Sequence, residues 1–201
     1  PSYLPLARSF MKFKAGRLDA VINVKKGIVD GFFSDVVITF RNYAVTLEER
    51  AIDINGVQDL ADKSVVAFQR ASKLLGSAFG EVVQDNSEYG EVADQSLQLK
   101  RLFKLRVEAI VLERKIFMYL RKQLFEQVKQ LGGNYVLTME ELEKPVVFHD
   151  IFPATDYRVA FRSQEVRDDF NEGLRIIRES GTYADIIAKY NEQFRLDRIQ
   201  P

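Results

Sequence analysis

Short runs of apolar residues alternate with amphipathic helical patterns along almost the whole sequence, and this alternation constrains the fold more than any other feature. The clearest case is "DKSVVAFQRASKLLG" at residues 62–76, where an apolar run stops at a polar turn and a helical pattern follows. A continuous run of about four apolar residues is typical of a buried parallel strand. Strands that alternate with helices of about ten or more residues indicate an α/β protein with largely parallel sheets.

Two long extended segments, at residues 35–47 and 146–161, are rich in β-branched and aromatic residues. Between them lies a block of about 100 residues with its own alternation of strands and helices, which is the size of a domain. We therefore expect two lobes joined by two strands. Lobe 1 would comprise residues 1–40 and 155–201, and lobe 2 would comprise residues 41–154. A ligand would bind between the lobes, at the carboxyl ends of strands.

The same patterns predict the individual elements. Helical spacing favours helices at residues 4–14, 72–83, 95–105, 114–131, 163–180 and 182–194. Shorter apolar or β-branched runs favour further strands at residues 18–24, 64–68, 88–94, 107–113 and 134–139.

Charge and composition exclude several classes of function. Lys plus Arg and Asp plus Glu both number 29, so no net charge favours binding to nucleic acid or to a membrane surface. The chain has no cysteine, which excludes disulfides and thiolate metal sites. Its single histidine, His149, excludes a zinc site built on several histidines and is expected at the surface or a hinge rather than in catalysis. We expect no metal and no cofactor.

Five segments, in order over nearly the whole chain, resemble those of one known family. They are "YLPLARSFMKFKAGRLDAVI", "FSDVVITFRNYAV", "DLADKSVVAFQRAS", "VEAIVLER" and "FRSQEVRDDFNEGLRIIRESGTYADIIAKY". Together they resemble the type II periplasmic binding proteins, and specifically extracellular solute-binding family 3, the polar amino-acid-binding components of ABC importers. The resemblance implies an α/β, two-lobed periplasmic-binding-protein-like II fold, known as a Venus flytrap.

The resemblance also implies that a part of lobe 1 is missing. The family opens with a strand–helix–strand unit, which takes about 30 residues or more, and this sequence begins at the helix that follows. Without that unit the sheet of lobe 1 would have an uncovered edge. We expect a fragment, an exchange of elements between chains, or a reduced protein, so self-association through the incomplete lobe is one possible outcome.

The turn after the strand at 64–68 supplies the first candidate ligand-binding residues. The resemblance places Ser72 where the family holds a ligand carboxylate with a hydroxyl and a helix N-terminus; the alternative is an ordinary helix N-cap. Arg70 stands where the family has Gly, and it would either pair with a carboxylate or lie in solvent. Gln69 belongs to the same turn.

Further candidates lie at the ends of other predicted strands. Glu113 aligns with the family Asp that accepts a ligand ammonium; the alternative is a carboxylate that stabilises a helix start. After residues 18–24 the family has Thr and then Arg, whereas here only Lys25 and Lys26 are cations and Asn23 could supply an amide. Arg41 would reach the cleft or support the hinge. The missing Arg puts binding of standard α-amino acids in doubt.

The resemblance, together with these residues, implies four possible functions. The first is a periplasmic solute-binding protein that closes on a small polar or amino-acid-like ligand and presents it to an ABC permease in the inner membrane. The second is a ligand-sensing input domain of a signalling system. The third is an enzyme with Glu113 as acid or base, which the lack of a catalytic constellation disfavours. The fourth is a derivative that no longer binds standard amino acids.

Overall fold

The computed structural model describes residues 3–132 and 135–193. This part of the chain forms two compact units, which are described separately. Unit 1 contains the residues up to Phe40 together with Ala154–Glu192, and Arg41–Pro153 lies in unit 2. The chain therefore passes from one unit to the other between Phe40 and Arg41, and returns between Pro153 and Ala154.

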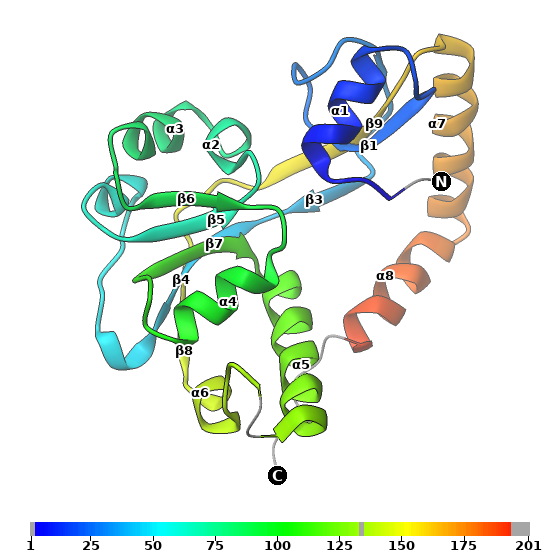
Figure 1. The fold of residues 1–201 in the computed structure, drawn as a ribbon. Helices are drawn as coiled ribbons and strands as arrows, with labels where there is room; N and C mark the ends of the chain where they lie inside the picture. Colours follow the sequence, from blue (N-terminus) through cyan, green and yellow to red (C-terminus); the bar gives the residue numbers. More distant parts are fainter. Residues whose placement is uncertain (1–2, 133–134, 194–201) are drawn as a thin grey trace. The chain divides into compact units, whose positions relative to one another are not determined.

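Unit 2 is built on a five-stranded mixed sheet (Figure 1). Its strands are β4 (Asn42–Leu47), β5 (Val65–Phe68), β6 (Tyr89–Val92), β7 (Ala109–Glu113) and β8 (Val146–His149). They lie in the order β6-β5-β7-β4-β8, with β5 parallel to β6 and β7, and β4 antiparallel to β7 and β8. The expected parallel βα alternation is confirmed for the three strands β5, β6 and β7.

Helices α2 (Ala71–Leu74) and α3 (Ser77–Gln84) cover one face of this sheet, and α4 (Ser96–Phe103) and α5 (Arg114–Leu131) cover the other (Figure 1). The unit also contains η1 (Glu48–Arg50), η2 (Val57–Leu60) and α6 (Met139–Glu143). Alternate residues of each strand enter different cores. In β7, Ala109 and Val111 belong to the core on the α2–α3 face, together with Ala71 and Phe79. Ile110, which lies between them in the strand, belongs to the core on the α4–α5 face. This is the period-two alternation of a sheet buried on both sides.

Two predicted elements of unit 2 differ from the structure. The single helix expected at 72–83 is two helices, because Gly76 adopts a φ of +106° between α2 and α3, a conformation that L side chains rarely adopt. The strand expected at 134–139 is wrong for residues 135–139, which form no strand, and residue 134 lies outside the described residues. Thr138 instead caps α6, accepting a hydrogen bond from the Glu141 N–H at 3.2 Å.

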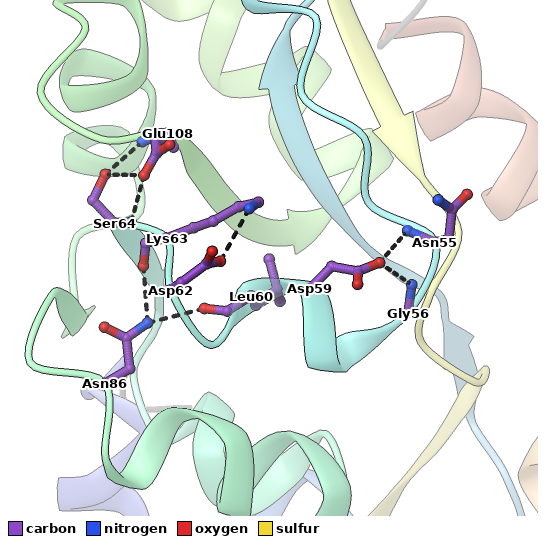
Figure 2. A network of polar contacts seen from close by, with 9 residues as sticks. All are labelled: Asn55, Gly56, Asp59, Leu60, Asp62, Lys63, Ser64, Asn86 and Glu108. Atoms are coloured by element: carbon purple, nitrogen blue, oxygen red, sulfur yellow. Dashed lines mark hydrogen bonds and ion pairs between the residues drawn. The ribbon is translucent and has the colours of Figure 1, made fainter.

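Polar contacts at the amino edge of the sheet fix the starts of the strands (Figure 2). The N–H and hydroxyl of Ser64, just before β5, donate to the Glu108 carboxylate at 2.8 and 3.1 Å. Glu108 precedes β7, and its own N–H donates back to the Ser64 hydroxyl at 2.9 Å. The Asn86 side-chain amide donates to the carbonyls of Leu60 and Lys63. These bonds satisfy backbone groups where the loops enter the strands.

Unit 1 contains a smaller sheet centred on one strand. Its elements are α1 (Leu6–Lys14), β1 (Ala20–Val24), β2 (Phe32–Phe33), β3 (Ile38–Phe40), β9 (Thr155–Phe161), α7 (Gln164–Glu179) and α8 (Thr182–Gln193). Strand β9 pairs antiparallel with β1, β2 and β3. The expectation of largely parallel sheets is therefore wrong for the described strands of this unit. Phe10 and Phe13 of α1 pack against Val21 and Val24 of β1.

One further expectation concerns the end of the last helix. Residue 194, the last of the helix expected at 182–194, lies outside the described residues. Over the ranges that the structure covers, we find no helix with both the length and the apolar character needed for a membrane span.

Candidate functional site

The carboxyl ends of β5, β6 and β7 lie at one edge of the unit 2 sheet because the three strands are parallel. Ala67 of β5 is level with Glu91 of β6 and with Val111 of β7. Glu113 lies two residues beyond Val111, so its side chain shares the face of Glu91. Asn42 of β4 pairs directly with Glu113 and shares that face too. The topology thus gathers two carboxylates and an amide on the α2–α3 face at this edge.

Four hydrogen-bond donors converge on the Glu91 carboxylate. The Ser72 N–H and hydroxyl donate to Glu91 Oε1 at 3.0 and 2.7 Å, and the Tyr89 hydroxyl donates to the same oxygen at 2.9 Å. The Arg70 N–H donates to Oε2 at 2.5 Å. The donors that the sequence assigns to a ligand carboxylate are therefore engaged by a carboxylate of the chain itself.

These bonds shift the pKa values of both β6 side chains. Partial burial alone would raise the pKa of Glu91, but hydrogen bonds from Ser72, Tyr89 and Arg70 lower it below its usual value. Burial, and then the bond to the Glu91 carboxylate, raise the pKa of Tyr89 above its usual value. Glu91 is consequently ionised and Tyr89 is a neutral donor at neutral pH.

The turn that carries Ser72 differs from the sequence expectation. Helix α2 begins at Ala71, and the residue that precedes it, Arg70, is left-handed with a φ of 68°. The N-cap alternative for Ser72 is therefore wrong, since Ser72 is the second residue of the helix and its hydroxyl bonds Glu91. Gln69 is half-buried in the same turn. Contact of Gln69, Arg70 or Ser72 with a ligand stays a prediction.

Glu113 stands at the end of β7 and caps α5. Its carboxylate accepts a hydrogen bond from the Ile116 N–H at 2.9 Å, so the helix-start alternative is observed. The side chain is only 8% exposed, and this burial raises the pKa of Glu113 despite the backbone hydrogen bonds that oppose the shift. A buried carboxylate of this kind favours a cationic neighbour, but its binding of a ligand ammonium stays a prediction.

Arg41 lies where the chain enters unit 2, and Asp150 lies shortly before the chain leaves it. The Arg41 Nη1 donates to both carboxylate oxygens of Asp150, at 2.8 and 3.1 Å. This ion pair joins the two crossing segments and favours the hinge-supporting alternative for Arg41. Both side chains remain about half exposed, so the pair contributes modestly to stability.

Asn23 and Lys25 belong to unit 1. The pairing of β1 with β9 shifts by one residue between Val21 and Val24, and Asn23 adopts a left-handed φ of 57° in this bulge. The Asn23 side chain is exposed, and the Lys25 carbonyl accepts the Ile28 N–H in the following turn. Their roles in binding stay predictions, whereas the structure brings Gln69, Arg70, Ser72 and Glu113 to one edge of unit 2.

Sequence reasoning missed three residues of this edge: Asn42, Tyr89 and Glu91. Residues 88–94 were expected as a strand, so the alternation of side chains could have placed Tyr89 and Glu91 on one face. The register of β6 against β5 was still needed to bring Glu91 to Ser72.

Among the described residues, no group of three or more His, Asp or Glu side chains is arranged so that it could hold a metal ion. His149 is half-buried, and its Nε2 lies 2.9 Å from the Thr46 hydroxyl on the neighbouring strand. Burial lowers the pKa of His149. The contact with Thr46 links β8 to β4 within unit 2.

No family model matches the sequence, and no curated protein matches it either. Solved structures do match. An amino acid ABC transporter substrate-binding protein, AbpA from Streptococcus pneumoniae, bound to L-arginine, is similar with a TM-score of 0.70 at 16% identity, over 96% of this chain and 76% of that one. An ancestral arginine-binding protein bound to arginine has a TM-score of 0.67 at 19% identity, over 94% and 78%.

A histidine kinase sensor domain with similarity to periplasmic binding proteins matches as well, with a TM-score of 0.68 at 17% identity, over 92% of this chain and 75% of that one. The expected fold is therefore confirmed: the chain has the two-lobed α/β fold of the type II periplasmic binding proteins. It spans about three quarters of the length of these structural neighbours.

Proposed function

We propose that this chain is a solute-binding protein of the periplasm that captures a small polar, amino-acid-like ligand and delivers it to the permease of an ABC importer. The ligand would bind without chemical change. The carboxyl edge of unit 2 carries this proposal, because Asn42 pairs with Glu113 there and Ser72 lies in the turn that follows the neighbouring strand β5. In open α/β sheets, ligands bind at such edges.

The ligands held by the similar solved structures support binding rather than catalysis. Two of the similar structures hold arginine, and one of them is a component of an amino acid ABC transporter. At the edge itself, Glu113 is a buried carboxylate beside the amide of Asn42, a combination that suits an ammonium group.

A thermal-shift screen of the chain against amino acids, polyamines and small organic acids tests this function. A ligand at a hundredfold its Kd would stabilise the protein by about 2.7 kcal/mol, which raises the Tm by roughly 5–10 °C. The Glu113→Gln variant should lose most of this shift. Glu140→Gln, which makes the same change on exposed α6, should retain it. No shift with any compound would refute the proposal.

A sensing role is the second candidate, because the histidine kinase sensor domain has the same fold. Both roles need ligand binding, so the screen does not separate them. A permease encoded next to this protein would favour import, and a neighbouring kinase or cyclase would favour sensing. Self-association through unit 1 also stays a prediction, which the mass in solution would test.

A further inference from the structure

Four hydrogen-bond donors, from the turn between β5 and α2 and from the adjacent strand β6, point at one carboxylate. Two backbone N–H groups and two hydroxyls, from Arg70, Ser72 and Tyr89, reach the two oxygens of Glu91 at 2.5–3.0 Å. A carboxylate is acceptor-only and takes about four hydrogen bonds. The Glu91 carboxylate therefore uses the whole donor set.

This occupancy changes which ligands the edge can take. A second carboxylate at the same donors would lie within a few ångströms of Glu91, and two like charges at that separation repel strongly. An external carboxylate must instead displace Glu91, which is tethered to the chain and thus has an effective concentration on the order of millimolar or higher. Glu91 is exposed as a residue although its carboxylate is partly buried among the donors, so the side chain is not enclosed in the core.

The charges near this edge are of both signs, since Arg70 lies in the turn before α2 and the charge of Lys115 acts on Glu113. Glu113 lies on the same face as Glu91, and both are acidic. Arg41 is already engaged by Asp150. A ligand group that lies beside the carboxylates of Glu91 and Glu113 therefore gains more from a positive charge than from a negative one.

We propose that Glu91 is a specificity-determining residue that takes the place of a ligand carboxylate, so that the ligand is an organic amine with no carboxylate at this position. This inference rests on the proposed function and narrows its ligand class. It assigns Glu113 and Asn42 to the amine, and it assigns the donors around Ser72 to the chain itself.

The first test needs no ligand. The Tm of the chain, of Glu91→Ala and of Glu88→Ala is measured in sodium acetate and in sodium chloride of equal ionic strength. Glu88→Ala removes the same charge from an exposed residue just before β6. Acetate should refill the vacated donors and raise the Tm of Glu91→Ala by about 2 °C or more over chloride. The other two proteins should not distinguish the salts.

Equal responses of all three proteins to acetate would overturn the role of Glu91. Glu91→Gln provides a second variant of nearly the same size, which keeps the test valid if truncation to Ala unfolds the chain. Its amide nitrogen cannot accept hydrogen bonds, so Glu91→Gln should be less stable than the wild type at neutral pH.

The second test compares L-arginine with agmatine, which differ only in the α-carboxylate, by calorimetric titration. The wild type should bind agmatine at least about tenfold more tightly, and Glu91→Ala should narrow or reverse this ratio. Tighter binding of arginine by the wild type would overturn the proposal. If neither compound binds any variant, the amine assignment fails, and the acetate experiment still decides separately whether Glu91 fills the carboxylate position.

Discussion

Two serine–glutamate pairs stand at opposite edges of the unit 2 sheet, and they use the same two donors differently. At the amino edge, the N–H and hydroxyl of Ser64 donate to Glu108 (Figure 2). At the carboxyl edge, the N–H and hydroxyl of Ser72 donate to Glu91. The amino-edge pair joins the starts of two adjacent strands and is reciprocal, because the Glu108 N–H returns a bond to Ser64.

The carboxyl-edge pair has no such return bond among its contacts, and two further donors are added from Arg70 and Tyr89. Its carboxylate is exposed, whereas Glu108 is half-buried. The same local chemistry therefore fixes a strand start at one edge and holds an exposed carboxylate at the other. The two pairs differ in the exposure of the carboxylate to solvent and in the number of donors that surround it.

The largest loss of stability at the carboxyl edge is expected from a substitution at Gly80, which belongs to neither serine–glutamate pair. A Cβ added at Gly80 of α3 would lie 2.7 Å from the Ser72 carbonyl oxygen, so Gly80→Ala must displace the turn at the carboxyl edge. We expect a loss of about 2 kcal/mol in the free energy of unfolding. Denaturant unfolding would measure it. Gly173→Ala in α7, where an added Cβ would have no described atom within 4 Å apart from its chain neighbours and the helix's own backbone, should be neutral or stabilising. Equal effects of the two variants would contradict the close contact.

Removal of the amino-edge carboxylate should have the next largest effect. Glu108→Ala leaves the Ser64 N–H without its half-buried acceptor and should cost about 1.5 kcal/mol. Glu91→Ala should cost less, about 1 kcal/mol, because water reaches the donors at the exposed edge. The two Tm values provide the comparison. A larger loss for Glu91→Ala would show that the carboxyl-edge pair is mainly structural.

The sequence predicted much of the fold and part of this edge, for identifiable reasons. The apolar runs of β5 and β7 are continuous because both faces are buried, so they were visible without coordinates. The break at Gly76 was missed because helical spacing continues across it. Glu91 was missed because its partner Ser72 lies 19 residues earlier, and the pairing depends on the register between β5 and β6. Local patterns do not specify such a register.

The smallest expected effect is a contrast in pH dependence between the two carboxylates of the carboxyl edge. The pKa of Glu91 is lowered, so its ionised form stabilises the fold above the ordinary carboxyl pKa, about 4.3, and this contribution is lost as the pH falls through the lowered value. The pKa of Glu113 is raised, so its ionised form disfavours the fold, and this penalty disappears as the pH falls through the raised value.

Denaturant unfolding of Glu91→Gln and Glu113→Gln between pH 7.5 and pH 3.5 would measure this contrast. At pH 7.5, Glu91→Gln should be less stable than the wild type, and Glu113→Gln should be equally or more stable, since its side-chain oxygen can still accept the Ile116 N–H. The difference in the free energy of unfolding between each variant and the wild type should shrink as the pH falls. The difference for Glu113→Gln should shrink first, because the pKa of Glu113 is the higher of the two. If the Glu91 difference disappeared first, the donors around Ser72 would not be holding an ionised carboxylate, and the distinction between the two edges would fail.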